Sequence, residues 1–284
     1  MSTAASPSTP LPVRTPGTRA RGRHRRPERH EIPADAPALL VAVPAEATPA
    51  AQQIADELVS LLRGEQPGIN VRVGYLTSTG DESATLAALL AEAAAAELPT
   101  PVVVPLLPGP DARFATALAQ LRSGLEGEVR VTDALGPHPL LAEALHVRLS
   151  EAGLARADRA RLFAITTSAD GIVLGTVGGA EALQLAEVTG VLLAARLAVP
   201  VVAAALDEPG AVAAAAAHLR ETGCAQPALA PYLFGPEVDA ALLKNEAAEA
   251  DCQASEPLGA YPTVARLVLG LYLGELGLEY ELEG

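Results

Sequence analysis

An acid and a guanidinium, Asp111 and Arg113, follow the apolar run VVVPLLPGP at residues 102–110. A short apolar run that ends in proline and glycine predicts a buried strand, so both charges should lie just past its C-terminal end. In an open α/β sheet, ligands bind at this edge. Arginine can bind a carboxylate through two parallel hydrogen bonds, which makes Arg113 a candidate substrate-binding residue. An ion pair with Asp111 is an equally good interpretation.

Carboxylates recur at the corresponding place later in the chain. Asp111 and Glu237 each follow a Gly-Pro pair, and Asp239 lies two residues beyond Glu237. Each of the three is a candidate for binding a substrate. A carboxylate at such a place can also cap the helix that follows, and capping is the favoured interpretation for Asp111 and Glu237.

The pattern Leu-Gly-x-x-Pro occurs twice, as LGPHP at residues 135–139 and as LGAYP at residues 258–262. Glycine permits an unusual backbone angle and proline suits the first turn of a helix, so each copy predicts a helix start. His138 and Tyr261 occupy the same place in the two copies. His138 could bind a ligand in a cleft, but a polar residue at a helix start is the simpler interpretation.

Two further groups of residues could bind a ligand in the second half of the chain. Ser168 and Asp170 are expected just after the first strand of that half, near a cleft, and are substrate-binding candidates. Their spacing to histidine does not suggest a catalytic nucleophile. The stretch GTVGG at residues 175–179 opens a helix and could bind an anion there, but it matches no phosphate-binding motif and is interpreted as a turn.

Three stretches recur in the same order at nearly constant spacing, which predicts an internal duplication. The offsets are 123, 126 and 123 residues for DALGPHPLLAEAL (133–145) with EPLGAYPTVARLV (256–268), VVPLLPGPD (103–111) with LAPYLFGPE (229–237), and ALLVAVPAE (38–46) with RLFAITTSA (161–169). The predicted organisation is a disordered Arg/Pro-rich tail at residues 1–35 and two homologous lobes at residues 36–157 and 158–284.

Apolar runs alternate with helical stretches in both lobes. The runs predict strands near residues 38–43, 70–76, 101–107, 128–132, 161–166, 199–205, 227–233 and 251–256. The stretches between them predict helices near residues 49–64, 83–97, 112–124, 139–152, 179–197, 210–222, 237–250 and 262–276. Alternating elements predict the α/β class, with a parallel sheet flanked by helices in each lobe. The loops after residues 43, 107, 166 and 233 should line a central cleft between the lobes.

Composition limits the classes of partner. The net charge of −14 divides into +4 on residues 1–35 and −18 on the remainder, and such an acidic body is a poor nucleic-acid binder. Charge and proline interrupt the apolar runs before about 18 residues, so no membrane span is expected. The N-terminus lacks the apolar region of a secretory signal, and two isolated cysteines suit a reducing compartment, so a cytoplasmic location is expected.

The chain resembles the sirohydrochlorin/cobalt chelatase family, the class II chelatases, in its long form with two fused halves. The stretches that carry the resemblance are ALLVAVPAE, VVVPLLPGPDARF, LGPHPLLAEAL, LAPYLFGPE and LGAYP. The resemblance implies insertion of Co²⁺ or Fe²⁺, as a substrate, into a tetrapyrrole on the route to sirohaem or cobalamin. It implies no tightly bound cofactor, and it places the macrocycle in the cleft between two lobes.

The family's two histidines are missing from the matching positions. The resemblance implies one histidine in a VxHG-like pattern after the first strand and another in the loop after the third strand. Here these positions hold Val43, followed by the substrate-binding candidate Pro44, and Arg113, while the corresponding loop of the second half holds Asp239. Neither valine nor arginine can ligate a metal or accept a proton at neutral pH.

Three hypotheses follow. The first is a working chelatase that uses carboxylates, with His138 as a base. The second is a degenerate, non-catalytic relative that binds the tetrapyrrole or another enzyme of the tetrapyrrole pathway, and the missing histidines favour it. The third is a two-lobed α/β protein that binds an unrelated small anion or a partner enzyme.

Overall fold

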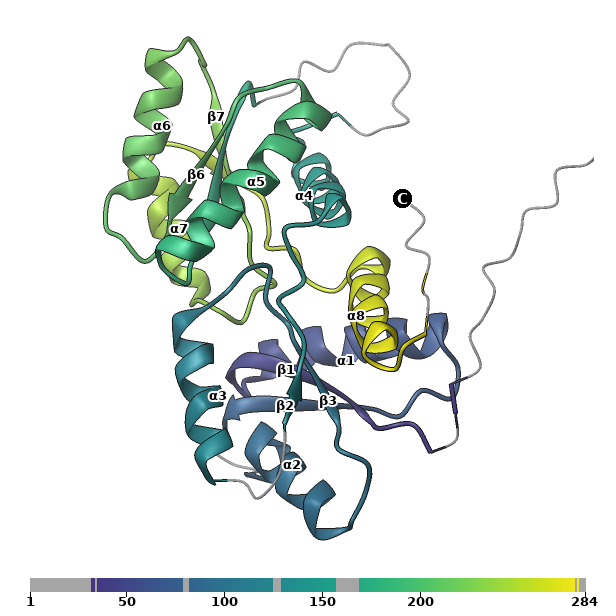
Figure 1. Cartoon of the computed structure of the whole chain (residues 1–284). Coiled ribbons are helices and arrows are strands. Elements are labelled where there is room, and N and C mark those ends of the chain that lie inside the picture. Colours follow the sequence, from purple (N-terminus) through teal and green to yellow (C-terminus); the bar gives the residue numbers. More distant parts are fainter. Residues whose placement is uncertain are drawn as a thin grey trace, which may run out of the picture.

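The chain folds into two α/β lobes, each built on a parallel sheet (Figure 1). The structure, a computed structural model, describes residues 32–33, 35–78, 82–124, 129–156, 169–278 and 280. Most of the predicted tail lies outside these residues, so its disorder stays a prediction. The predicted boundary between the lobes, at residues 157 and 158, also falls outside them and stays a prediction.

The first sheet has the strand order β2-β1-β3-β4. Its strands are β1 (Leu39–Glu46), β2 (Val71–Thr77), β3 (Val102–Pro105) and β4 (Arg130–Val131). The helical elements of this half are α1 (Pro49–Glu65), the short 3₁₀ helix η1 (Glu82–Ala84), α2 (Leu86–Ala95), α3 (Ala112–Gly124) and α4 (Pro139–Glu151). The predicted strands and helices of this half are confirmed to within a few residues.

The second sheet has the order β6-β5-β7-β8, the same arrangement as the first. Its strands are β5 (Gly171–Thr176), β6 (Val201–Ala205), β7 (Pro227–Pro231) and β8 (Gln253–Ala254). Its helices are α5 (Ala180–Leu197), α6 (Ala211–Glu221), α7 (Ala240–Glu249) and α8 (Pro262–Glu275). The two sheets are thus alike, while the duplication of the sequence itself stays a prediction.

The first strand of the second half was predicted in the wrong place. β5 pairs with β6 and β7 in the middle of the second sheet, so it takes the role that the sequence assigned to residues 161–166. Residues 161–168 lie outside the described residues. The GTVGG stretch was interpreted as a turn, but its first two residues, Gly175 and Thr176, belong to β5.

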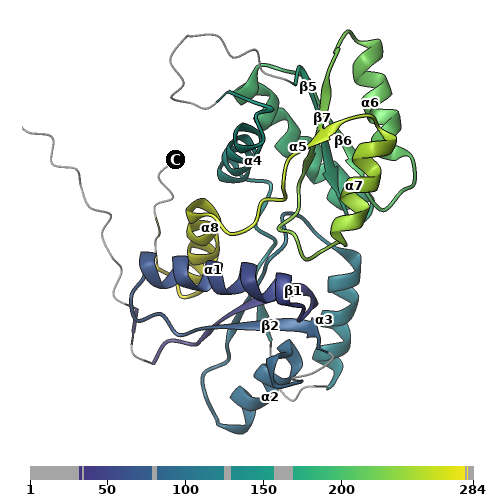
Figure 2. The ribbon, with the colours of Figure 1, turned by 180° about the vertical axis from the view of Figure 1, so that it is seen from behind.

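Two helices are exchanged between the halves (Figures 1 and 2). α4 follows the first sheet in the chain but packs against α5, and α8 ends the second half but packs against α1 and β3. Arg130 on β4 donates to the Glu275 side chain at 3.2 Å, and the Tyr272 hydroxyl donates to the carbonyl of Pro37 at 2.7 Å. We therefore call the first sheet with α1, α2, α3 and α8 the first lobe, and the second sheet with α4, α5, α6 and α7 the second lobe.

One apolar core runs through both lobes. It joins inner-face residues of the first sheet, such as Leu39 and Val41, to residues of α4, α5, β7 and α8. Separate clusters cover the outer faces, under α2 and α3 in the first lobe and under α6 and α7 in the second. The lobes are consequently joined by buried apolar contact and not by their linking segments alone.

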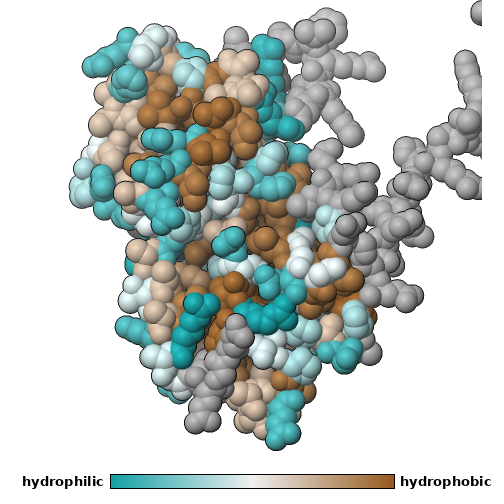
Figure 3. Space-filling view, in the orientation of Figure 1, coloured by the Kyte–Doolittle hydropathy of each residue, from teal (hydrophilic) through white to brown (hydrophobic). Residues whose placement is uncertain are grey.

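α5 packs on α4 with one side and exposes apolar side chains on the other. Val188 and Val191 are 47% and 69% exposed, and Figure 3 shows apolar side chains gathered over this part of the second lobe. Among the described residues, no helix is both long and apolar enough to pass through a bilayer.

Candidate functional site

A pocket of about 670 Å³ lies between the lobes at the C-terminal ends of β3, β4 and β5. Its lining residues fall within segments 105–118, 131–136 and 178–185, so the first lobe supplies two loops and the second lobe one. This is the edge at which open parallel sheets bind ligands. The loop after residue 107 lines the pocket as expected, whereas the loops after residues 43 and 233 are absent from its described lining.

Asp111 and Arg113 form the ion pair that their spacing allowed. The Arg113 guanidinium Nη2 donates to Asp111 Oδ2 at 2.8 Å, while the backbone N–H groups of Arg113 and Phe114 donate to Oδ1 at 2.7 and 3.1 Å. Burial acts to raise the pKa of Asp111, but these hydrogen bonds and the charge of Arg113 outweigh it and hold that pKa below its usual value. Asp111 therefore stays ionised and caps the first turn of α3, as predicted.

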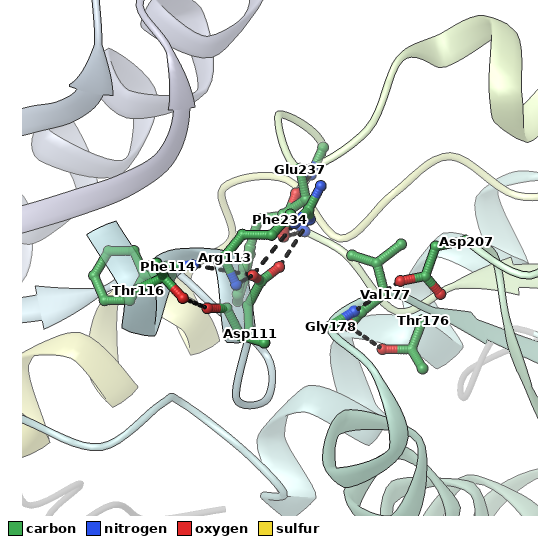
Figure 4. A network of polar contacts seen from close by, with 12 residues as sticks. Asp111, Arg113, Phe114, Thr116, Thr176, Val177, Gly178, Asp207, Phe234 and Glu237 are labelled. Carbon is green, nitrogen blue, oxygen red and sulfur yellow. Dashed lines mark hydrogen bonds and ion pairs between the residues drawn. The ribbon is translucent and has the colours of Figure 1, made fainter. Parts of the chain in front are cut away.

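Arg113 is near the pocket but does not line it. Its side chain is 64% exposed, and it extends toward Glu237 of the second lobe, as Figure 4 shows. Its ion-pair partner, Asp111, does line the pocket. The binding of a substrate carboxylate by Arg113 stays a prediction.

Glu237 does not cap the helix after it, contrary to the sequence interpretation. Its two carboxylate oxygens accept hydrogen bonds from the backbone N–H groups of Phe234 and Gly235, each at 2.6 Å, so it stabilises the turn that precedes it. Burial raises the pKa of Glu237 to about 7, and the nearby charge of Asp111 acts in the same direction. Hydrogen bonds from the backbone N–H groups of Phe234, Gly235 and Glu237 itself act against both. Glu237 is thus a buried carboxylate that titrates near neutral pH.

Asp239 and His138 both cap helices. Asp239 accepts a hydrogen bond from the N–H of Ala241 at 2.8 Å, at the start of α7. The Nδ1 atom of His138 accepts one from the N–H of Leu140 at 3.1 Å, at the start of α4, and burial lowers the pKa of this histidine. Neither residue is in the described lining of the pocket.

The segment after β1's apolar run does not reach the pocket. Val43 is fully buried in the core between the first sheet and its inner helices, and Pro44 is half-buried beside it. A histidine in place of Val43 would therefore point into apolar packing. Pro44 as a substrate-binding residue stays a prediction.

Asp170 lies at the wrong end of the second sheet for a pocket residue. It precedes β5, and its carboxylate accepts hydrogen bonds from the N–H groups of Ala225 and Gln226 at 2.6 and 2.8 Å. The prediction that it lies near the cleft was wrong because it rested on a strand at residues 161–166. Ser168 lies outside the described residues.

The sequence interpretation missed the lining residues Gly178, Gly179, Asp133 and Glu181. Gly179 is the N-cap residue of α5 and has no side chain that could accept a hydrogen bond from the first turn of the helix. The backbone N–H groups of that turn therefore lie at the pocket without a side-chain acceptor. Such a helix end attracts anions, and the flanking carboxylates attract cations. The signal was the GTVGG stretch before a helix, which had been set aside as a turn.

No imidazole or thiol lines this pocket among the residues that the structure describes. In the same part of the chain, no group of three or more His, Cys, Asp or Glu side chains could hold a metal ion. The pocket can therefore offer backbone N–H groups and single carboxylates to a ligand.

The two glycines of this loop allow a matched comparison. A Cβ at Gly178 would lie 2.5 Å from the carbonyl oxygen of Pro110 in the other lobe, whereas a Cβ at Gly179 would meet nothing within 4 Å. Both have positive φ, at 115° and 89°, so both alanine variants carry backbone strain. We expect Gly178→Ala to lose about 2 kcal/mol more unfolding free energy than Gly179→Ala, measured by urea denaturation. Equal losses would mean that the lobes do not meet at this loop.

Part of the chain matches a known protein family. Residues 46–152 match the model of the CbiX family. The matched stretch includes the loop with Asp111 and Arg113 and ends after α4. A comparison with curated protein sequences finds no significant match.

Solved structures share the fold. A structure of SirB from Bacillus subtilis with Fe3+ matches with a TM-score of 0.62 at 15% identity. The sirohydrochlorin chelatase SirB from Bacillus subtilis subspecies spizizenii, in complex with cobalt, matches with a TM-score of 0.58 at 13% identity. Each alignment covers 86% of this chain and 99% of the other. A multi-domain Deinococcus radiodurans protein with structural similarity to chelatases matches with a TM-score of 0.57 at 17% identity, over 84% of this chain and 55% of that one.

Proposed function

We propose that this chain is a class II chelatase-family protein that binds a tetrapyrrole in the pocket between its lobes and inserts metal into it slowly or not at all. The observation that carries the proposal is the lining of that pocket. It offers an uncapped helix N-terminus and carboxylates, but neither imidazole nor thiol among its described residues.

The first turn of α5 supports binding of a polycarboxylate. Sirohydrochlorin carries several carboxylates, and one of them could accept hydrogen bonds from N–H groups near Gly179 and Ala180. The apolar lining, which includes Leu107, Phe114 and Leu118, suits the face of a macrocycle. Two names among the similar structures, a sirohydrochlorin chelatase with cobalt and SirB with iron, support this ligand class and Co²⁺ or Fe²⁺ as metal substrates.

Proton handling argues against rapid insertion. Metal insertion displaces pyrrole protons, and a neutral imidazole is well suited to accept them near neutral pH. Position 113 holds an arginine paired with Asp111, and position 43 holds a buried valine. The carboxylates of Asp133 and Glu181 would attract a divalent cation to the pocket without replacing that base.

A second candidate is a binding protein for an unrelated small anion. The uncapped N-terminus of α5 favours it, because backbone N–H groups bind carboxylate and phosphate alike. Binding of a partner enzyme of the tetrapyrrole pathway is compatible with either function.

Titration with sirohydrochlorin, followed by absorbance, tests the proposal. We expect a spectral change on binding without metal, and insertion of Co²⁺ or anaerobic Fe²⁺ no faster than in protein-free solution. Rapid insertion would contradict the catalytic part of the proposal. No spectral change would contradict tetrapyrrole binding and favour the small anion.

A pair of α3 variants locates the site. Ala115 and Ala119 are both exposed on this helix, but only Ala115 lines the pocket. A tryptophan at the first position should fill the pocket from its rim without disturbing the core. We expect Ala115→Trp to weaken binding by about tenfold or more, equivalent to at least about 1.4 kcal/mol, and Ala119→Trp to leave it unchanged. Equal effects of the two variants would place the ligand elsewhere.

A further inference from the structure

The loop that carries Arg113 is in close contact with the other lobe. The Tyr232 hydroxyl donates to the carbonyl oxygen of Pro108 at 3.1 Å, and the backbone at Gly178 lies against Pro110 and Asp111. We call the meeting of loops 108–113, 177–179 and 234–237 the seam. It adjoins the pocket, whose lining includes Asp111 and Gly178.

Negative charge gathers at the seam from both lobes. Asp111 comes from the first lobe and is 5% exposed, and Asp207 of the second lobe is exposed. Glu237 comes from the second lobe, is 6% exposed and carries its negative charge above its pKa of about 7. Asp207 also accepts a long hydrogen bond, 3.5 Å, from the N–H of Gly178. Like charges at close range oppose contact most strongly where burial removes water.

The charges of all three carboxylates act on the Arg113 guanidinium. It forms an ion pair with Asp111, and the charges of Asp207 and Glu237 each raise the pKa of Arg113, after the larger effect of its hydrogen bond to Asp111. Figure 4 shows the side chain extending from the first lobe toward Glu237 and Phe234 of the second. The cation is therefore directed at the seam and not into the pocket.

We infer that Arg113 is a positioning residue that holds the seam closed by balancing carboxylates of both lobes. Without this charge, Asp111 faces Glu237 and Asp207 uncompensated, and the turn at residues 234–237 separates from loop 108–113. This separation would widen the pocket at the side where the two lobes meet. The inference concerns the unliganded protein and does not rest on the proposed function.

Amide hydrogen exchange in the unliganded full chain tests the inference at a pH above the Glu237 pKa of about 7, where this carboxylate is ionised. The reporters are the N–H groups of Phe234 and Gly235, which donate to Glu237 and whose sequence neighbours no variant at position 113 alters. We expect Arg113→Ala to accelerate their exchange by about tenfold, although the substitution is in the other lobe. Arg113→Lys, which keeps the charge, should stay within about twofold of the wild type.

Two further experiments distinguish the loss of the Arg113 charge from a loss of packing by its side chain: a control variant, and the same substitution made in a second variant. Arg72→Ala removes an exposed ion pair with Glu92 in the same lobe and should leave the reporters unchanged. In a Glu237→Gln background, where Phe234 supplies the reporter, Arg113→Ala should cause a smaller acceleration, because one opposing charge is already gone. Unchanged reporter exchange in Arg113→Ala, equal acceleration in Arg113→Lys, or equal effects in both backgrounds would each overturn the inference.

Salt provides a version of the test that needs no variant. Arg113 is 64% exposed, whereas Asp111 and Glu237 are buried and their repulsion is screened less. About 1 M NaCl should therefore weaken the balancing charge more than the repulsion and speed exchange at Phe234 and Gly235 in the wild type. The expected direction is that of Arg113→Ala. If the alanine variant fails to fold, exchange in the wild type that is unaffected by salt overturns the inference.

Discussion

Gly136→Ala is expected to lower the unfolding free energy by about 3 kcal/mol. A Cβ at Gly136 would lie 2.4 Å from the Tyr232 hydroxyl, 2.5 Å from the Pro108 carbonyl oxygen and 2.8 Å from a methyl group of Leu141. Two of these atoms belong to the hydrogen bond that joins the lobes, and Tyr232 is held in addition by a 2.9 Å bond from the Thr189 hydroxyl. Relief of the clash must therefore disturb contact between the lobes.

Urea denaturation measures this loss, and a thermal melt should show a midpoint roughly 6–12 °C lower. Gly124→Ala is the control, because a Cβ there meets nothing within 4 Å and Gly124 ends an exposed stretch of α3. Adding Tyr232→Phe to Gly136→Ala removes the nearest clashing atom, so the two losses should combine to less than their sum. A Gly136→Ala protein as stable as the Gly124→Ala protein would contradict the close approach of the lobes at this point.

Glu237→Gln is expected to remove a pH dependence of stability. The pKa of Glu237 is about 7 in the folded protein, raised by burial from 4.5, so the folded state binds the proton more tightly than the unfolded state. The resulting stability is fully present below about pH 4.5 and is lost as pH rises through about 7. The difference in unfolding free energy between wild type and Glu237→Gln should therefore fall by about 3 kcal/mol between these limits.

Urea denaturation of both proteins over this pH range gives the measurement. Glu92→Gln is the control, because hydrogen bonding and the charge of Arg72 lower the pKa of Glu92. A lowered pKa makes stability fall as the solution becomes more acidic, below about pH 4.5, so this control should show no fall between pH 4.5 and 7. If the difference in unfolding free energy between wild type and Glu237→Gln stays constant or rises with pH, Glu237 is ionised throughout this pH range.

Local sequence patterns predicted most of the elements. Proline and glycine separate short apolar runs from helical stretches, so strands such as β3 and helices such as α3 were found near their observed limits. β5 was missed because its sequence, GIVLGT, has glycines where a strand usually carries side chains. Gly171 and Gly175 leave room for Cys224 and Leu206, contacts made by residues more than 30 positions away. Such tertiary reasons are invisible in a local pattern, whereas RLFAITT resembles an ordinary strand.

The candidate site likewise has some contacts that local sequence predicts and others that depend on long-range packing. The pairing of Asp111 with Arg113 could be predicted because the two residues are close in sequence. The direction of the Glu237 contacts could not, since a carboxylate can accept N–H groups from either side of it. The position of the α5 N-terminus at the pocket depends on how the lobes meet, and that follows from long-range packing.

Neither half of this chain could cover its own sheet alone, because α4 and α8 each pack in the lobe of the other half. Two separate half-length chains would have to lend these helices to each other, as a domain-swapped dimer does. Their assembly would then depend on protein concentration. Covalent fusion supplies the partner at a fixed, high effective concentration, so the full-length chain can complete both lobes as a monomer at any dilution.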